Sequence, residues 1–172
     1  MDKYERDRIH NEGFADSYVK AEKATWVDFG PGIQMRLLRA TRETGHWSAV
    51  FKCAKGSTFG RHEHLGAGEY YVISGMAELR GGSEKGGNTS RAGDYAYEPN
   101  GVIHDATEFP EDSLVYFSND GPLKFMDDDN NILFIVDWRM LRDAACAAEL
   151  AAEMASQGKT DSPESASQQR VA

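Results

Sequence analysis

Short runs in which apolar and polar residues alternate dominate the middle of the chain. They are rich in β-branched and aromatic side chains, and the alternation is typical of half-buried β-strands. Turn sequences such as Gly86-Gly87-Asn88 separate one run from the next. The predicted strands cover 33–38, 47–53, 69–74, 76–80, 94–98, 102–109, 114–118, 123–127 and 132–138. About nine strands at this spacing predict an all-β fold, an antiparallel jelly-roll sandwich or barrel.

A helical pattern follows the last predicted strand and runs from Trp138 to residue 155. The segment is rich in Ala, the residue most favourable to a helix. Its apolar residues recur at three- and four-residue steps and form one face: Met140, Ala144, Ala147, Leu150 and Met154. We expect this C-terminal helix to cover the β body or to pack against a partner subunit.

The two ends of the chain differ in composition from this middle part. Residues 1–24 are polar with little periodicity, and residues 156–172 are rich in Ser, Gln and charged side chains. Such segments bury too little apolar surface to offset the entropy of ordering. The sequence therefore predicts one domain over 25–155, a loosely ordered N-terminal segment over 1–24 and a flexible tail over 156–172.

The charge of the chain excludes several kinds of partner. A formal net charge of −9 and a pI near 5.0 disfavour nucleic acid and anionic lipid as partners, and no basic cluster offsets them. The N-terminus is charged where a signal peptide is apolar, and no apolar run is long enough for a membrane span, so we expect a cytoplasmic protein. Two cysteines, Cys53 and Cys146, are too few for a disulfide framework.

Candidate chemistry gathers in GRHEHLGAGEYYVISG, residues 60–75, where His62 and His64 stand one residue apart. Residues i and i+2 of a strand share a face, so both imidazoles would project side by side. A third histidine, His104, follows the turn at Pro99-Asn100-Gly101, and two antiparallel hairpins could bring it opposite the pair. A single histidine on a strand is more commonly structural. Three in this arrangement predict a metal site.

The spacing of these residues resembles the two motifs of the cupins, G-x5-H-x-H-x3,4-E-x6-G and G-x5-P-x-G-x2-H-x3-N. Positions matching the first motif, with one residue fewer before the last glycine, are Gly56, His62, His64, Glu69 and Gly75. Positions matching the second, with Glu108 in place of asparagine, are Gly93, Pro99, Gly101 and His104. The resemblance implies the cupin double-stranded β-helix, a jelly-roll barrel. Many cupins use the glutamate of the first motif as a metal ligand, which makes Glu69 a second-rank candidate.

Residues 47–138 are similar in more detail to the family of acetylacetone-cleaving, iron(II)-dependent dioxygenases. The similarity lies in WSAVFKCAKGS, GEYY, ELRGGSEKGG, GPLKFMDD and DW. It implies Fe(II) held by three histidines without a carboxylate, and O2-dependent cleavage of a C–C bond in a β-dicarbonyl or related ketone. The products would be a carboxylate and an α-dicarbonyl compound. It also implies a homodimer or homotetramer.

The same resemblance implies roles for five more residues. Glu98 would support a metal-binding histidine, Arg80 would line the approach to the metal, and Tyr70 would join them as a candidate catalytic residue. Phe59 and Phe117, together with Tyr70, would belong to the aromatic wall of the substrate pocket. Aromatic side chains in a β-barrel are more commonly core residues, and Glu98 could be an exposed carboxylate at a strand end.

Three neutral imidazoles leave the full charge of a divalent ion uncompensated, and this suits a chelating enolate anion. Imidazole also binds zinc and nickel, so two other functions remain open. One is a Zn(II)- or Ni(II)-dependent isomerase or hydrolase without redox chemistry. The other is a small-molecule-binding protein without turnover.

Overall fold

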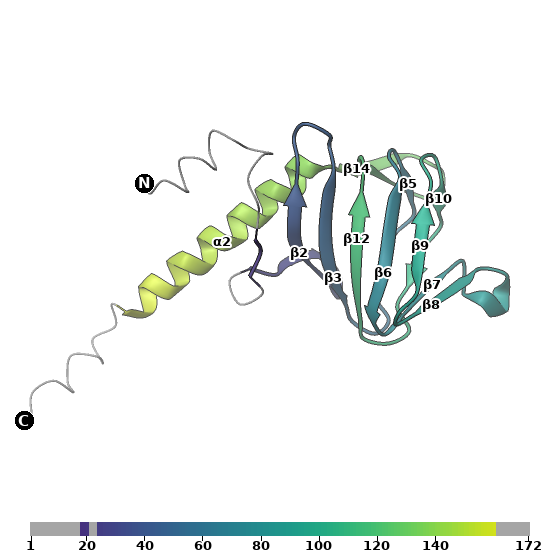
Figure 1. Ribbon diagram of the computed structural model, residues 1–172, viewed down its shortest axis with the longest axis horizontal. Coiled ribbons are helices and arrows are strands. Elements are labelled where there is room, and N and C mark those ends of the chain that lie inside the picture. Colours follow the sequence, from purple (N-terminus) through teal and green to yellow (C-terminus); the bar gives the residue numbers. More distant parts are fainter. Residues whose placement is uncertain (1–17, 21–23, 161–172) are drawn as a thin grey trace, which may run out of the picture.

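The alternating runs form antiparallel strands in three sheets. The computed structural model describes residues 18–20 and 24–160, with side chains up to residue 156. The largest sheet has six strands (Figure 1) in the order β1 (Val27–Gly30), β2 (Ile33–Ala40), β3 (Trp47–Cys53), β12 (Ser113–Asn119), β6 (Gly68–Ser74) and β9 (Tyr95–Glu98).

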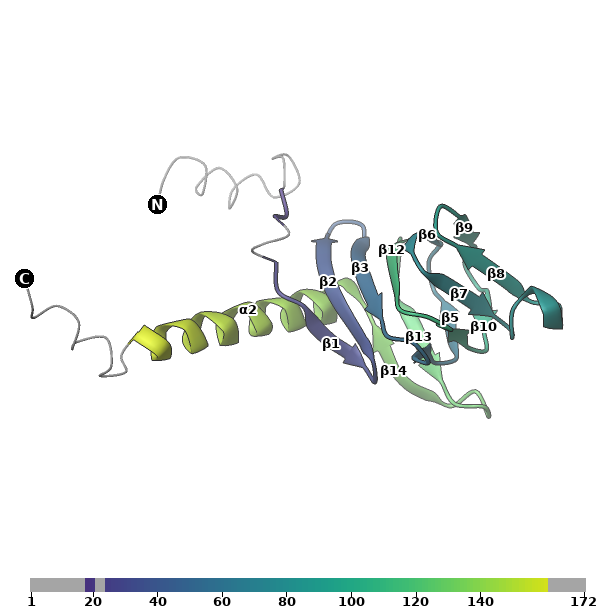
Figure 2. The same cartoon turned by 90° about the horizontal axis from the view of Figure 1, so that it is seen from below.

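Two four-stranded sheets lie against the large one, as the turned view shows (Figure 2). The first has the order β10 (Ile103–His104), β5 (His62–His64), β13 (Leu123–Met126) and β14 (Ile132–Val136). The second has the order β4 (Thr58–Phe59), β11 (Thr107–Glu108), β7 (Met76–Leu79) and β8 (Asn88–Arg91), and the loop from β7 to β8 carries the 3-10 helix η1 (Ser83–Lys85).

The segment 102–109, predicted as one strand, is divided between these two small sheets. Asp105 and Ala106 interrupt it, so that β10 pairs with β5 while β11 pairs with β4 and β7. The sequence also does not predict β1, β4 and β8. Of these, β4 has only two residues and β8, NTSR, has no apolar residue, so neither shows the alternation typical of a strand. The break at Asp105 places His104 on the sheet of β5.

The core fills the space between the large sheet and the small ones. Its most deeply buried apolar side chains, at 2% exposure or less, are Met35, Trp47, Ala49, Phe51, Cys53, Val72, Phe109, Val136 and Leu141. Burial of each large apolar side chain contributes roughly 1.5–3 kcal/mol. The Trp47 indole also donates a hydrogen bond to the carbonyl of Gly121 at 3.0 Å. The β5 strand borders this core through its pairing with β13, whose Leu123 and Phe125 are also buried.

Gly75, the last glycine of the first motif, forms the turn between β6 and β7. Its φ is +80°, in the left-handed region that favours glycine, and an added Cβ would lie 2.3 Å from Ser113 Oγ. Ser113 Oγ in turn accepts the backbone N–H of Met76 at 2.9 Å. A larger residue at position 75 would therefore displace the start of β12 from the turn.

Only the first turns of α2 (Trp138–Thr160) pack on the β body. Asp137 begins the helix by accepting the N–H of Met140 at 2.8 Å, and Leu141 is buried. From there α2 projects away from the sheets (Figure 1), and Leu150 and Met154 are 59% and 65% exposed. The expectation that the helix covers the β body thus holds only for its start.

The predicted terminal segments lie largely outside the described residues, which exclude 1–17, 21–23 and 161–172. The helix itself continues to Thr160, five residues past the predicted boundary at 155. Within the described part of the chain, no helix has both the length and the apolar character needed to cross a membrane.

Candidate metal centre

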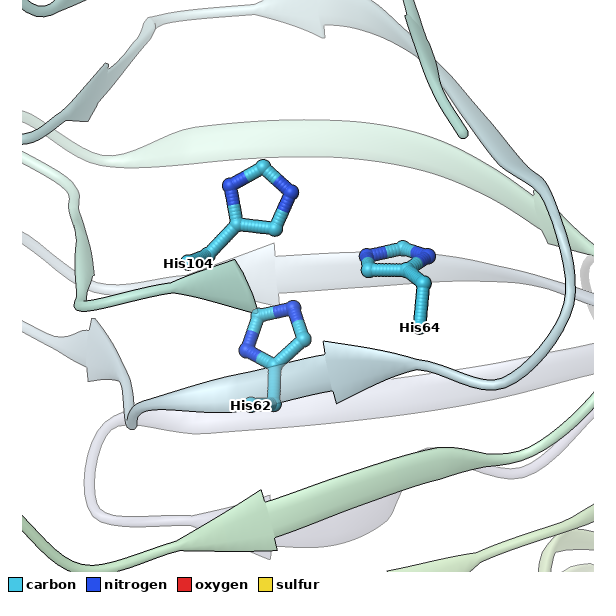
Figure 3. Close-up of side chains that lie close together, drawn as sticks. All are labelled: His62, His64 and His104. Atoms are coloured by element: carbon cyan, nitrogen blue, oxygen red, sulfur yellow. The ribbon is translucent and has the colours of Figure 1, made fainter. Parts of the chain in front are cut away.

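Three histidines meet on neighbouring strands, as Figure 3 shows. His62 and His64 project from the same face of β5, and His104 of β10 is the register partner of His62. The ring centroids are 5.2 Å apart for His62 and His64, 5.3 Å for His62 and His104, and 5.2 Å for His64 and His104. One nitrogen from each ring lies within 4.8 Å of the other two. The cluster predicted from the sequence is therefore formed.

Neighbouring groups fix the orientation of two of the rings. The carbonyl of Gly60 lies 2.8 Å from His62 Nδ1, and Asn119 Oδ1 lies 3.2 Å from His64 Nδ1. Asn119 is oriented in turn, because its Nδ2 donates to the carbonyl of Gly121. Both rings therefore carry their proton on Nδ1 and keep the lone pair of Nε2 for a metal.

Gly68 allows Asn119 to approach His64 this closely. An added Cβ at Gly68 would lie 2.6 Å from Asn119 Oδ1 and 2.8 Å from His64 Cε1. Any larger residue would separate the amide from the imidazole. The contact thus depends on β6 as well as on β12 and β5.

Burial keeps the three imidazoles uncharged. His64 is fully buried, and His62 and His104 are each 6% exposed. Desolvation lowers the pKa of all three imidazoles. The pKa of His64 falls to about 3, because the other two histidines add to the effect of burial. The pKa of His104 falls to about 4, because His62 and Arg80 add to the effect of burial. Neutral imidazole is the form that binds metal, so at neutral pH protons do not compete for these nitrogens.

Glu98 of β9 completes the cluster. Its two carboxylate oxygens lie 3.3 Å from His64 Nε2 and 3.3 Å from His104 Nε2, two buried nitrogens without a hydrogen-bond partner. Burial raises the pKa of Glu98 to about 7. Carboxylate and imidazole lone pairs that face each other repel unless a proton or a cation lies between them. The donor set therefore fits a metal cation.

Two cavities meet at Glu98. The inner one, of about 50 Å³, is lined by His62, Tyr70, Ala77, Glu98, Thr107, Phe109, Val115 and Phe117. The outer one, of about 330 Å³, is lined by Leu79, Arg80, Gly86, Gly87, Asn88, Tyr97, Glu98, Pro99, Val102 and His104. Glu98 thus borders both a small, mostly apolar cavity and a larger one whose lining is mixed polar and apolar.

Comparison with known proteins assigns the chain to a family. Residues 15–124 match the model of the ChrR cupin-like domain. The chain is a cupin. It is 36% identical over 148 residues to the acetylacetone-cleaving enzyme of Acinetobacter johnsonii. The alignment covers 83% of this chain and 97% of that protein.

Solved structures agree with this assignment. The crystal structure of an acetylacetone dioxygenase from A. johnsonii aligns with a TM-score of 0.72 at 36% identity, over 78% of this chain and 93% of the other. An RmlC-like cupin from Ralstonia eutropha JMP134 aligns with a TM-score of 0.70 at 19% identity, over 80% of this chain and 88% of the other. The cupin fold with a C-terminal helix, expected from the sequence, is confirmed.

Three of the remaining predicted site residues of this cupin line one of the two cavities, and one lines neither. Tyr70 and Phe117 line the inner cavity, and Arg80 lines the outer one. Arg80 stands just past β7 with a left-handed φ of +53°, and it donates to the carbonyl of Ile103 at 3.4 Å. Phe59 does not line either cavity, and instead packs behind Phe109 with 5.9 Å between ring centroids.

Glu69 lies on the outer face of β6, between the inward-facing Gly68 and Tyr70. It is exposed and accepts a hydrogen bond from the Tyr95 hydroxyl at 2.7 Å. Because alternate strand residues face opposite sides, Glu69 cannot reach the cluster without a change of register. Glu98, not Glu69, is the carboxylate beside the histidines.

Two residues near the cluster escape the sequence prediction. Asn119 stands in a turn sequence, Asn-Asp-Gly-Pro, and gives no signal of a contact with His64. Phe125 of β13 lies against His62, with 5.2 Å between ring centroids, because β13 pairs with β5. Only the strand pairing across the barrel brings these residues to the histidines.

Proposed function

We propose that this cupin is a non-haem iron(II)-dependent dioxygenase that cleaves a C–C bond of a β-dicarbonyl or related ketone with O2. The observation that carries the proposal is the buried cluster of His62, His64 and His104, uncharged and beside an apolar cavity. Similarity at 36% identity to an acetylacetone-cleaving enzyme supports the reaction class.

The three histidines would hold the iron. When bound, the ion supplies Lewis acidity and one-electron chemistry toward O2. Because the imidazoles are neutral, the charge of the ion stays available to an anionic enolate. Arg80 at the outer cavity would attract the anion as it approaches.

Glu98 would handle the proton that a β-dicarbonyl releases when it becomes an enolate. Its carboxylate lies 3.3 Å from His64 Nε2 and from His104 Nε2, so a substrate bound at the metal would release its proton beside a carboxylate that can act as general base. Because Glu98 lines both cavities, it would lie beside a substrate in either one.

The walls of the inner cavity would exclude water and limit substrate size. Ala77, Phe109, Val115 and Phe117 present apolar surface around about 50 Å³. The balanced reaction adds both atoms of O2 to the substrate, which leaves as one carboxylic acid and one α-dicarbonyl compound. A substrate with short side arms fits this space better than one with bulky groups.

Metal analysis and oxygen uptake test the proposal together. Purified protein is reconstituted with Fe(II) or with Zn(II) and screened with small β-dicarbonyls in an oxygen electrode. We expect O2 uptake with iron and none with zinc. Product formation with zinc or nickel would favour the isomerase or hydrolase, and binding without product would favour the binding protein.

The variant His104→Ala tests the ligand set in the same assay. Loss of one of three histidines should remove both metal and O2 uptake. Full iron occupancy in this variant would exclude His104 as a ligand. Half-buried His46, whose Nδ1 lies 2.9 Å from Asp120 Oδ1 outside the cluster, provides the matched control His46→Ala.

We also propose a cytoplasmic homodimer or homotetramer. Apolar side chains stay exposed on α2 and along β14, where Ile132, Leu133, Phe134 and Ile135 are 46–60% exposed. Contact with a second copy would bury them. Light scattering coupled to gel filtration measures the state, and a monomer at micromolar concentration would contradict the proposal.

A further inference from the structure

A chain of three hydrogen-bonded side chains lies behind the wall of the inner cavity. Ser90 of β8 is 4% exposed, and its Oγ lies 2.8 Å from the hydroxyl of Tyr70. Asn88, two residues earlier on the same strand, donates from Nδ2 to this Oγ at 2.8 Å. Asn88 lines the outer cavity and Tyr70 the inner one, so the chain connects the two.

The donors in this chain can be assigned. An amide nitrogen only donates, so Ser90 Oγ accepts from Asn88. Among the described residues, the hydroxyl hydrogen of Ser90 then has the Tyr70 oxygen as its acceptor. A buried hydroxyl hydrogen without an acceptor is strongly unfavourable. Ser90 therefore donates to Tyr70. The Asn88 side chain also reaches the Tyr70 hydroxyl, but its amide nitrogen only donates, so the hydrogen of the Tyr70 hydroxyl remains available for another acceptor.

We propose that Ser90 is a positioning residue that sets Tyr70 as a hydrogen-bond donor into the inner cavity, toward an oxygen of a bound β-dicarbonyl enolate. The assignment rests on the proposed function. Hydrogen bonds to an anionic oxygen are stronger than neutral ones, so the direction of this donor matters for affinity. Donation from Asn88 strengthens Ser90 as a donor, because hydrogen bonds in a chain polarise one another.

The two possible directions of the hydrogen bond between Ser90 and Tyr70 predict opposite changes in enolate affinity when Ser90 is replaced. If Tyr70 donated to Ser90, removal of the Ser90 hydroxyl would release the Tyr70 hydrogen and leave enolate binding unchanged or tighter. If Ser90 donates to Tyr70, its removal lets the Tyr70 hydroxyl rotate away from the cavity. Binding then becomes weaker. The sign of the change in affinity therefore decides between the two directions.

Titration of the zinc-loaded protein with an enolate measures this change in affinity without turnover. The absorbance of acetylacetonate is titrated in the wild type, Ser90→Ala, Tyr70→Phe and the double variant. We expect Ser90→Ala to weaken binding roughly 3- to 10-fold, the size of one net hydrogen bond. The double variant should bind no more weakly than Tyr70→Phe, since Ser90 acts through Tyr70. Ser90→Thr keeps a hydroxyl and should restore the wild-type affinity.

Ser48→Ala is the matched control, because Ser48 is a buried serine at 6% exposure on β3 that lines neither cavity. It should leave affinity unchanged. Unchanged or tighter binding in Ser90→Ala, or additive losses in the double variant, would overturn the assignment.

A second measurement reads the hydrogen bond without any substrate. The seven tyrosines are labelled with 13C at Cζ, and Tyr70→Phe identifies the resonance of Tyr70. Ser90→Ala should shift that resonance and leave the other six in place. An unshifted resonance would refute the contact between Ser90 and Tyr70. If Ser90→Ala shifts the resonance as expected but the zinc-loaded wild type does not bind acetylacetonate, the dicarbonyl substrate, and with it the proposed function, would be refuted instead.

Discussion

Asn119 determines which nitrogen of His64 is available to a metal. Its Oδ1 accepts from Nδ1 of His64 at 3.2 Å, and both residues are almost fully buried. Asn119→Ala would leave that N–H without an acceptor, and the ring would be free to turn. We expect metal affinity to fall about 10- to 100-fold, as for other groups that support metal ligands. Competition with a chelator measures this.

The variant Asn119→Asp separates affinity from stability. It keeps an oxygen beside His64 but loses the donor to the carbonyl of Gly121. We therefore expect metal affinity near that of the wild type together with a lower melting temperature. Wild-type affinity in Asn119→Ala would show that His64 needs no support from this amide.

Glu98 is the second residue whose substitution is informative. Glu98→Gln keeps the shape of a side chain that lies 3.3 Å from two histidine nitrogens, but it cannot titrate. We expect most of the metal to remain and the O2-uptake rate to fall about 10- to 100-fold. Any pH dependence of the rate that comes from titration of this carboxyl should also disappear. A rate equal to that of the wild type at every pH would exclude a role for this carboxylate.

At the level of strands, the sequence predicts the residues that share one strand and misses the contacts between distant ones. His62 and His64 follow from the two-residue period of a strand, His104 from the motif spacing, and Glu98 from the resemblance to the dioxygenase family. Asn119 and Phe125 reach the histidines through the pairing of β12 with β6 and of β13 with β5. Strand register depends on the whole barrel, so no local pattern reveals it.

The helix α2 shows the same limit in another form. Its apolar spacing predicts the helix correctly, but not that most of this face, including Leu150 and Met154, stays exposed. Described residues from Ala151 to Ser156 are all exposed, so they add little to the core. A chain that ends at Ser156 should therefore keep its metal content, melting temperature and O2 uptake. Loss of any of these would show that the last turn or the tail contacts the barrel or a second copy.

For the whole molecule, the buried histidines link stability to pH. In the unfolded chain a histidine takes up a proton near pH 6.5, whereas the pKa in the folded protein is about 3 for His64 and about 4 for His104. Below pH 6.5 the unfolded state therefore binds more protons, and the free energy of unfolding falls as pH falls. Glu98 acts in the opposite direction. Its pKa rises from 4.5 to about 7 on folding, so its contribution is present below 4.5 and is lost as pH rises through 7.

One carboxyl offsets only one of the three histidines, so we expect the metal-free protein to melt at a lower temperature at pH 5 than at pH 7. Calorimetry of chelator-treated protein at both values measures the difference. Glu98→Gln removes the opposing contribution and should enlarge the difference, whereas His104→Ala should reduce it. Adding metal at pH 7 should raise the melting temperature, because the ion binds the folded cluster in preference to the unfolded chain. Equal melting temperatures at pH 5 and pH 7 in the metal-free wild type would mean that the three imidazoles accept protons inside the folded barrel, against the burial that keeps them neutral.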